Sequence, residues 1–296
     1  MLRFGMVALE FAPAIDRIVR NGVPDFSHFV LPEIVREDLE IGNISVIEVT
    51  MDMVQIIPGV LSPKTITELM ELKEEIGHSY TVHLPLWSIE PSSFNRYIRE
   101  ASTEAIVHSI KLAQELEPEA FVFHSTGALA AEFSRLPLPS ELRFVLASYI
   151  NAFAEESLED ILAKTEIAPR KLAVENIEFP FEVTRDLVDR FDTGICLDTG
   201  HVLSRQSGDE SLMEFYRNHR DRIVEIHIHD GSYPEGGRPF RTEHTALGRG
   251  EMPIREFLLE LMKDKYDGPL IFELTPDEVV ESLAKIRQVV PEALGN

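Results

Sequence analysis

The segment IVEIHIH, residues 223–229, alternates strictly between apolar and polar side chains. Successive side chains of a β-strand point to opposite faces, so one face of this strand is apolar and the other carries Glu225, His227 and His229. We expect the apolar face to meet helices and the polar face to point into a barrel. The segment therefore predicts a strand that brings ionisable groups to a barrel interior.

Seven other short runs also favour β-strands, and they occur at residues 2–9, 44–50, 80–86, 120–126, 171–177, 194–200 and 269–275. Helical patterns lie between them, for example at 65–77, 93–116, 141–165 and 277–290. Strands that alternate with helices indicate βαβ units and a parallel sheet. Eight such units predict an α/β fold with a single (β/α)8 TIM-barrel domain over residues 1–296. A doubly wound open sheet is the alternative, although no GxGxxG motif follows the first strand.

Local signals mark where some elements begin and where the loops lie. Ser62-Pro63 and Thr275-Pro276-Asp277 are typical of helix N-termini. The longest irregular stretches are 10–40, 125–140 and 230–252. The last two follow the fourth and seventh strands, which places them at the face of a barrel where active sites are built.

Composition narrows the class of protein. The 296 residues carry 51 acidic and 28 basic side chains, a net charge of −23 that disfavours DNA and other polyanions as ligands. The single cysteine, Cys196, excludes a disulfide within the chain, and we interpret it as a buried small hydrophobe. No basic segment with a long apolar run opens the chain, and no apolar run approaches 18 residues. We therefore expect a soluble, cytoplasmic protein without membrane contact.

Six consecutive predicted strands aim an ionisable side chain inward near their C-terminal ends. They are His83, His124, Glu175, Asp198, His227 and Glu273. An ordinary barrel interior is filled with branched apolar side chains, and an unpaired buried carboxylate such as Glu175 is costly. Imidazoles and carboxylates that converge from separate strands are the ligands of divalent metal ions. One strand histidine alone would more often be a core residue, but the six together predict a metal centre.

These residues resemble a known family. Glu175, Asp198, His227 and Glu273 are similar to the metal-binding quartet of the xylose isomerase-like and AP endonuclease family 2 barrels. LDTGH (197–201) resembles the Asp-x-x-His motif of that family, and HTALGRGEMP (244–253) resembles its His-x-x-Leu-Gly-x-Gly motif. Glu48 lies where many members carry an acid. The resemblance covers nearly the whole chain and implies a TIM barrel with divalent metal ions.

Two branches of that superfamily imply different chemistry. Its sugar isomerases and epimerases hold one metal ion with the quartet, whereas its endonuclease IV-like phosphodiesterases add histidines and hold a cluster. His83, His124, His201 and His244 resemble the second pattern. The resemblance implies two or three ions per chain, with zinc as the expected metal and manganese or cobalt as alternatives. The aspartate expected two residues before His244 is Thr242, which puts the third metal site in doubt.

A narrower resemblance concerns four segments: YTVHLPLW (80–87), AFVFHSTGAL (120–129), LAVENIEFP (172–180) and ICLDTGHVL (195–203). Together they look like the cobamide-remodelling phosphodiesterases of this superfamily, which remove the nucleotide loop of a cobamide. A small-molecule phosphodiester, such as a cobamide, is therefore the expected substrate.

The resemblance implies roles for individual residues. Glu175 would bridge two ions, with His83 and His124 completing one site and Asp198, His227 and Glu273 the other. Glu175 and Glu273 are the candidate catalytic acids and bases. Candidate substrate contacts are Glu48, Trp87, His229, Asp230 and Arg249, and His229 and Asp230 are alternatively partners of the metal ligands. Arg238, Arg241 and Arg249 form a candidate phosphate-binding cluster, although glutamates are interleaved with them.

Two other functions remain open. A one-metal sugar or sugar-phosphate isomerase would use Glu175 and Glu273 as its acid/base pair, with His201 and Arg249 on sugar oxygens. It would not need both His83 and His124. A metal-stabilised binding barrel without turnover is the third hypothesis, and the retained quartet argues against it.

Overall fold

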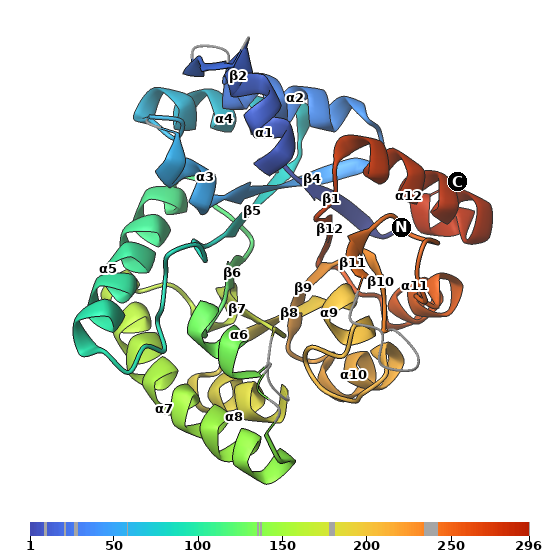
Figure 1. Ribbon diagram of the computed structural model, residues 1–296. Helices are drawn as coiled ribbons and strands as arrows, with labels where there is room; N and C mark the ends of the chain where they lie inside the picture. Colours follow the sequence, from blue (N-terminus) through green and yellow to red (C-terminus); the bar gives the residue numbers. More distant parts are fainter. Residues whose placement is uncertain are drawn as a thin grey trace.

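Eight parallel strands close into a barrel in the computed structural model, which describes residues 1–8, 11–20, 22–26, 29–57, 59–134, 136, 138–177, 181–233 and 242–295 (Figure 1). The barrel strands are β1 (Arg3–Val7), β4 (Ile44–Thr50), β5 (Ser79–His83), β6 (Phe121–Phe123), β7 (Leu172–Glu175), β8 (Gly194–Asp198), β9 (Ile223–His227) and β12 (Pro269–Phe272). Each pairs with its neighbours in the order β1-β12-β9-β8-β7-β6-β5-β4. The predicted (β/α)8 TIM barrel is confirmed.

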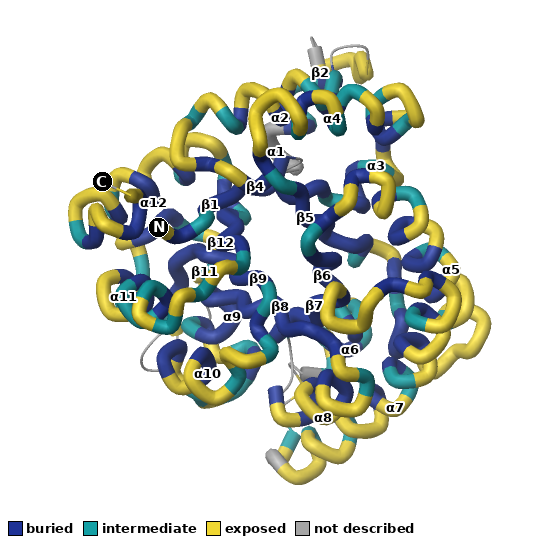
Figure 2. Tube along the Cα trace, turned by 180° about the vertical axis from the view of Figure 1, so that it is seen from behind, coloured by how far each residue is buried: buried dark blue, intermediate teal, exposed yellow. Residues whose placement is uncertain are grey.

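Helices form a layer around the barrel, and Figure 2 shows their outer sides exposed while the strands lie buried inside. The long helices are α2 (Leu31–Glu40), α4 (Pro63–Ile76), α5 (Arg96–Ala113), α7 (Ser140–Thr165), α8 (Phe181–Phe191), α10 (Leu212–His219), α11 (Ile254–Asp264) and α12 (Pro276–Val289). The predicted cap residues begin two of them: Ser62 accepts a hydrogen bond from the Thr65 amide, and Thr275 forms a capping box with Glu278. Within the described residues, no helix is long and apolar enough to cross a membrane.

The two faces of the strands divide the apolar core as the alternation predicts. Outward residues such as Phe121, Phe123 and Phe272 belong to the large cluster that packs the barrel on its helices. Inward apolar residues form two small separate clusters: Val7, Val46 and Ile271 in one, and Ala120, Val122, Ala173 and Cys196 in the other. The barrel interior is therefore packed, and Cys196 is buried as expected.

Most strands end at or just before an ionisable residue, which is earlier than the predicted runs. His83, Glu175, Asp198 and His227 are the last residues of their strands. β8 stops because the Asp198 side chain accepts a hydrogen bond from the His201 amide at 2.6 Å and so caps α9 (Thr199–Leu203). The strand ends therefore present these side chains at one face of the barrel.

The stretches predicted to be irregular contain regular structure. Residues 10–40 include α1 (Phe11–Ile18) and α2, and residues 128–134 form α6 (Ala128–Ser134), so Ala128 to Ala131 belong to a helix. After β9, β10 (Asp230–Ser232) and β11 (Thr242–Thr245) form an antiparallel pair. The prediction was wrong here because α1, α6, β10 and β11 are short, and because Pro32 within the first turn of α2 masks its helical pattern.

Candidate metal centre

The ionisable residues predicted to face inward converge at the C-terminal ends of the barrel strands. Six groups from the strand ends, together with His201 from α9 and His244 from β11, lie within salt-bridge distance of one another. Ligand atoms of His83, His124 and Glu175 lie within 4.8 Å of one another, as do those of Glu175, Asp198 and His201. All eight predicted metal ligands therefore meet in one place.

Glu175 lies at the middle of this cluster and is 2 % exposed. Its Oε2 atom is 2.8 Å from Nε2 of His124 and 3.5 Å from Nε2 of His83. Its other oxygen, Oε1, is 3.2 Å from Nδ1 of His201. Histidines thus approach both oxygens of one carboxylate from different elements.

His227 lies between three carboxylates on the other side of Glu175. Its Nδ1 atom is 3.2 Å from Glu273, 3.8 Å from Glu175 and 3.9 Å from Asp198. The His227 side chain is fully buried. Glu175 is consequently shared by a group that contains His83 and His124 and by a group that contains the rest of the quartet.

The charges of these groups are strongly interdependent. Burial alone would raise the pKa of the Glu175 carboxyl, but the charge of His124 and the close approach of the His124, His201 and His83 rings hold that pKa well below its usual range. Burial alone would lower the pKa of His201 and of His83. The neighbouring carboxylates have the larger effect, and they raise the pKa of His201 to about 10 and that of His83 to about 9. The carboxylates therefore favour positive charge at this position.

The donor set fits a divalent ion. Nδ1 of His201 and both ring nitrogens of His227 are buried and have no hydrogen-bond partner among the described residues. Leaving a buried polar atom unpaired is costly, and an ion between these histidines and carboxylates would satisfy it. His83 is also oriented for binding, because its Nδ1 lies 2.9 Å from the Leu84 carbonyl and its Nε2 faces Glu175.

Supporting residues that the sequence analysis missed hold the ligands in place. The Asn176 amide group donates to the Asp198 carbonyl at 3.1 Å and accepts from the Asp198 backbone N–H at 2.6 Å. The Thr199 hydroxyl donates to the carbonyl of His229 and accepts from the His229 N–H. Asn176 directly follows Glu175 in the sequence, and that proximity was the available signal.

His229 contacts the predicted metal ligand Asp198, and both of its ring nitrogens have hydrogen-bond partners. Its Nδ1 accepts a hydrogen bond from the backbone N–H of His244 at 2.9 Å, so in the neutral ring the proton must be on Nε2. That Nε2 lies 2.8 Å from Oδ2 of Asp198 and donates to it. His229 is fully buried, and it orients Asp198 instead of contacting substrate.

The third site of the predicted cluster is incomplete. Thr242 occupies the position of the expected aspartate, and its hydroxyl lies 2.6 Å from the Ser232 hydroxyl across the β10–β11 pair. His244 remains close, with Nε2 3.2 Å from Glu273. Its backbone has a φ of 51°, in the left-handed region that non-glycine residues rarely adopt. His244 is thus held at the site, close to Asp198 and Glu273, without an aspartate two residues before it in the sequence.

Two more residues that were predicted to contact substrate, Asp230 and Glu48, are fully buried and contact other groups of the protein. Asp230 accepts three backbone N–H groups, from Gly231, Gly248 and Met252, and so fixes the loop after β11. Glu48 lies in the middle of β4 with Oε2 3.5 Å from Nε2 of His227. Neither carboxylate is accessible for direct substrate contact.

The other predicted contacts lie at the surface. Trp87 is 41 % exposed in the loop that follows His83, where Asp52 accepts its backbone N–H. The Arg249 guanidinium is engaged by Glu281 and Glu278 of α12, so a phosphate would compete with two carboxylates for it. Arg238 and Arg241 lie outside the described residues.

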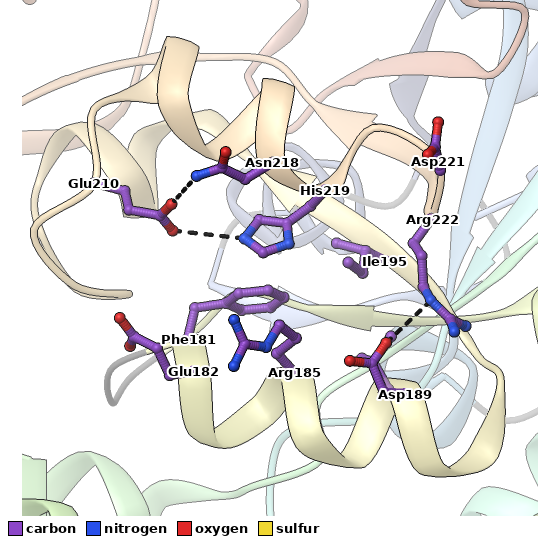
Figure 3. A pocket seen from close by; sticks show the side chains of 11 residues that line it. Phe181, Glu182, Arg185, Asp189, Ile195, Glu210, Asn218, His219, Asp221 and Arg222 are labelled. Atoms are coloured by element: carbon purple, nitrogen blue, oxygen red, sulfur yellow. Dashed lines mark hydrogen bonds and ion pairs between the residues drawn. The ribbon is translucent and has the colours of Figure 1, made fainter.

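A separate hollow of about 430 Å³ lies between α8 and α10 on the outside of the barrel (Figure 3). Its charged groups pair with one another: Glu210 contacts His219, and Asp189 contacts Arg222. None of the candidate metal ligands lines it. The chemistry of this barrel is therefore concentrated at the strand ends.

Comparison with known proteins identifies similar chains. The xylose isomerase-like TIM barrel family matches residues 40–289. An uncharacterised protein of Methanocaldococcus jannaschii is 25% identical over 248 residues, which cover 79% of this chain and 76% of that protein. A probable endonuclease 4 of Sulfurihydrogenibium is 25% identical over 215 residues, which cover 68% of this chain and 72% of that protein.

Solved structures share the fold. A D-tagatose 3-epimerase-like protein superimposes with a TM-score of 0.69 at 23% identity, covering 99% of this chain and 98% of its own. Endonuclease IV from Thermus thermophilus superimposes with a TM-score of 0.68 at 17% identity, and the aligned region covers 98% of this chain and 99% of the endonuclease chain. The two overlays are nearly equal, so they do not choose between the chemistries of the two proteins.

Proposed function

Because this chain belongs to the xylose isomerase-like TIM barrel family, we propose that it is a divalent-metal-dependent phosphodiesterase that acts on a small-molecule phosphodiester. The observation that carries the proposal is the pair His83 and His124 on Oε2 of Glu175. A single ion held by the quartet needs neither histidine. A second ion held by both of them and by Glu175 would explain why two imidazole nitrogens face the same oxygen of that carboxylate.

We propose two ions and not three. His83, His124 and Glu175 would hold one, and Glu175, Asp198, His227 and Glu273 the other. Thr242 offers only a hydroxyl that is already paired with Ser232, and the proton on Nε2 of His229 prevents that residue from serving as a replacement ligand. Zinc suits the mixture of imidazole and carboxylate ligands, and manganese and cobalt are the alternatives.

Divalent ions at this position would lower the pKa of water and polarise the phosphoryl oxygens. The chain itself supplies groups that can move a proton. Glu273 is 16% exposed at its side chain, and its Oε2 lies 3.2 Å from Nε2 of the half-exposed His244. Glu273 can accept a proton from the attacking water, and His244 can donate one to the leaving oxygen.

A cobamide is the specific substrate that we propose to test first. Four sequence segments around His83, His124, Glu175 and Asp198 resemble cobamide-remodelling enzymes, and exposed Trp87, in the loop that follows His83, offers an aromatic surface. The relatives called probable endonuclease 4 support phosphodiester chemistry in general. The net charge of −23 favours a small molecule over DNA.

The test is turnover of an adenosylated cobamide by protein reconstituted with zinc, manganese or cobalt. Loss of the nucleotide loop would be followed by chromatography, with bis(4-nitrophenyl) phosphate as a general diester. Glu175→Gln serves as the inactive control. Cleavage by the wild type alone supports the proposal, and no cleavage of either compound with any of the metals contradicts it.

The alternative is a metal-dependent sugar or sugar-phosphate isomerase or epimerase, with Glu175 and Glu273 as the acid/base pair. The absence of an aspartate at Thr242 favours it, because a one-ion quartet needs no ligand at that position. Epimerisation of a ketose by the same reconstituted protein, without diester cleavage, would establish this function instead.

A further inference from the structure

Glu48 is an isolated carboxylate inside the barrel. It is fully buried in β4, and neither of its oxygens has a hydrogen-bond partner among the described residues. A buried carboxylate without a donor or a cation is destabilising, so a group that it serves should be nearby. A ligand atom of Glu48 lies within 4.8 Å of those of His227 and Glu273, two of the candidate metal ligands.

The nearest imidazole is that of His227. Nε2 of His227 lies 3.5 Å from Oε2 of Glu48, while Nδ1 on the other side of the ring faces Glu273, Glu175 and Asp198. A neutral imidazole that ligates through Nδ1 carries its proton on Nε2. That proton would point at Glu48. The hydrogen bond would then satisfy both the buried Nε2–H of His227 and a buried oxygen of Glu48.

Neighbouring side chains limit where the Glu48 carboxylate can go. Glu225, two residues before His227 on β9, lies beside it, and the Thr81 hydroxyl donates to Oε1 of Glu225 at 3.0 Å. Thr81 is also the residue that pairs with Glu48 in the β4–β5 register. Thr81 and Glu225 therefore occupy space next to Glu48 in the same layer of the barrel interior.

We propose that Glu48 is a positioning residue of the metal centre, whose carboxylate accepts the Nε2–H of His227 and holds Nδ1 toward the ion. The inference rests on the metal centre of the proposed function, but it does not depend on which substrate is used. Carboxylates in this role make the histidine more basic and fix its ring, and their loss typically weakens metal binding by about 10–100-fold.

Metal affinity tests the proposal without any substrate. The variants Glu48→Gln and Glu48→Leu would be titrated with zinc and with cobalt against a competing chelator. We expect about 10-fold weaker binding of one ion in Glu48→Gln, which keeps an acceptor, and about 100-fold in Glu48→Leu, which does not. The ion held by His83 and His124 should bind with unchanged affinity, and the cobalt absorption spectrum should change for the other ion only.

Two controls make the result specific. Glu225→Gln replaces a carboxylate in the same buried layer without removing an acceptor from His227, so both ions should bind as in the wild type. His83→Ala should instead weaken binding of the ion that His83 and His124 hold. Loss of folding stability in the Glu48 variants with wild-type affinity for both ions would overturn the proposal.

A measurement on the wild type covers the case in which the variants do not fold. Nitrogen-15 NMR of the zinc-loaded protein should show His227 with a slowly exchanging proton on Nε2 and no proton on Nδ1. The opposite protonation would overturn the proposal. A failed phosphodiesterase assay would leave this result unaffected, so the two proposals fail independently.

Discussion

Nε2 of His124 lies 2.8 Å from Oε2 of Glu175, although the two residues end neighbouring segments of the barrel and are 51 positions apart. His201 approaches the other oxygen of the same carboxylate at 3.2 Å. A carboxylate surrounded in this way is suited to bridge two cations. We propose that this relationship belongs to a two-ion centre, whereas the quartet of an isomerase would hold one ion.

Replacing His83 by Ala should separate the two chemistries. In a two-ion phosphodiesterase the change removes a ligand, and we expect diester turnover to fall by about 100-fold or more. In a one-ion isomerase His83 is not a ligand, so ketose turnover should change only a few-fold. Steady-state rates of metal-saturated protein measure the effect, and a fully active diesterase after this substitution would exclude the two-ion mechanism.

Replacing Thr242 by Asp should add a third ion. The carboxylate would lie two residues from His244, where the sequence pattern of the phosphodiesterases carries an aspartate. We expect metal analysis after reconstitution to find about one more ion per chain than in the wild type. The reason is that a carboxylate binds zinc, whereas a threonine hydroxyl paired with Ser232 does not. Thr242→Ser keeps the hydroxyl and should leave the count unchanged, and an unchanged count in the aspartate variant would contradict our account of this site.

Replacing Asp230 by Ala should destabilise the loop that follows β11. Three backbone N–H groups lose their acceptor, and we expect the free energy of unfolding to fall by about 2–4 kcal/mol. Denaturant unfolding measures the change, and hydrogen exchange at Gly248 and Met252 should accelerate. Unchanged exchange at both amides would show that Asp230 does not fix this loop.

Asp38 should make stability depend on pH. Burial, against the opposing charge of Arg17, raises the pKa of this carboxyl to about 7 in the folded protein, above its ordinary value of 3.8. The folded state therefore holds the proton more tightly than the unfolded state, so this contribution to stability is full below pH 4 and is lost as the pH rises through 7.

Replacing Asp38 by Asn should remove that dependence. Between pH 6 and pH 8.5 we expect the wild type to lose about 1–2 kcal/mol more stability than the variant, as measured by urea unfolding at both pH values. The comparison with the wild type cancels the titration of other groups. Parallel pH profiles for the two proteins would show that Asp38 is not responsible.

The alternation along single strands was enough to predict the barrel and its inward groups. In IVEIHIH it assigned His227 to the interior, and the structure places that side chain among three carboxylates. The end of β4 at Thr50 was predicted correctly, but the other strand ends were predicted two or three residues too late. Side-chain caps such as that of Asp198 determine where the next helix begins.

The roles of neighbouring polar residues could not be predicted from sequence alone. His229 shares a face with His227, yet the backbone N–H of His244, 15 residues away, determines which of its nitrogens is protonated. Likewise, whether Glu48 meets substrate or a metal ligand depends on how deep it lies in the closed barrel. Both depend on contacts between distant segments, which the pattern of a single strand does not contain.

The number of ions per chain tests the central claim most directly. Wild-type protein reconstituted with zinc and freed of excess metal would be analysed by mass spectrometry beside Glu175→Gln. We predict two ions per chain in the wild type and at most one in the variant, because Glu175 is the ligand that both sites share. One ion in the wild type, or two in both proteins, would contradict the two-ion centre.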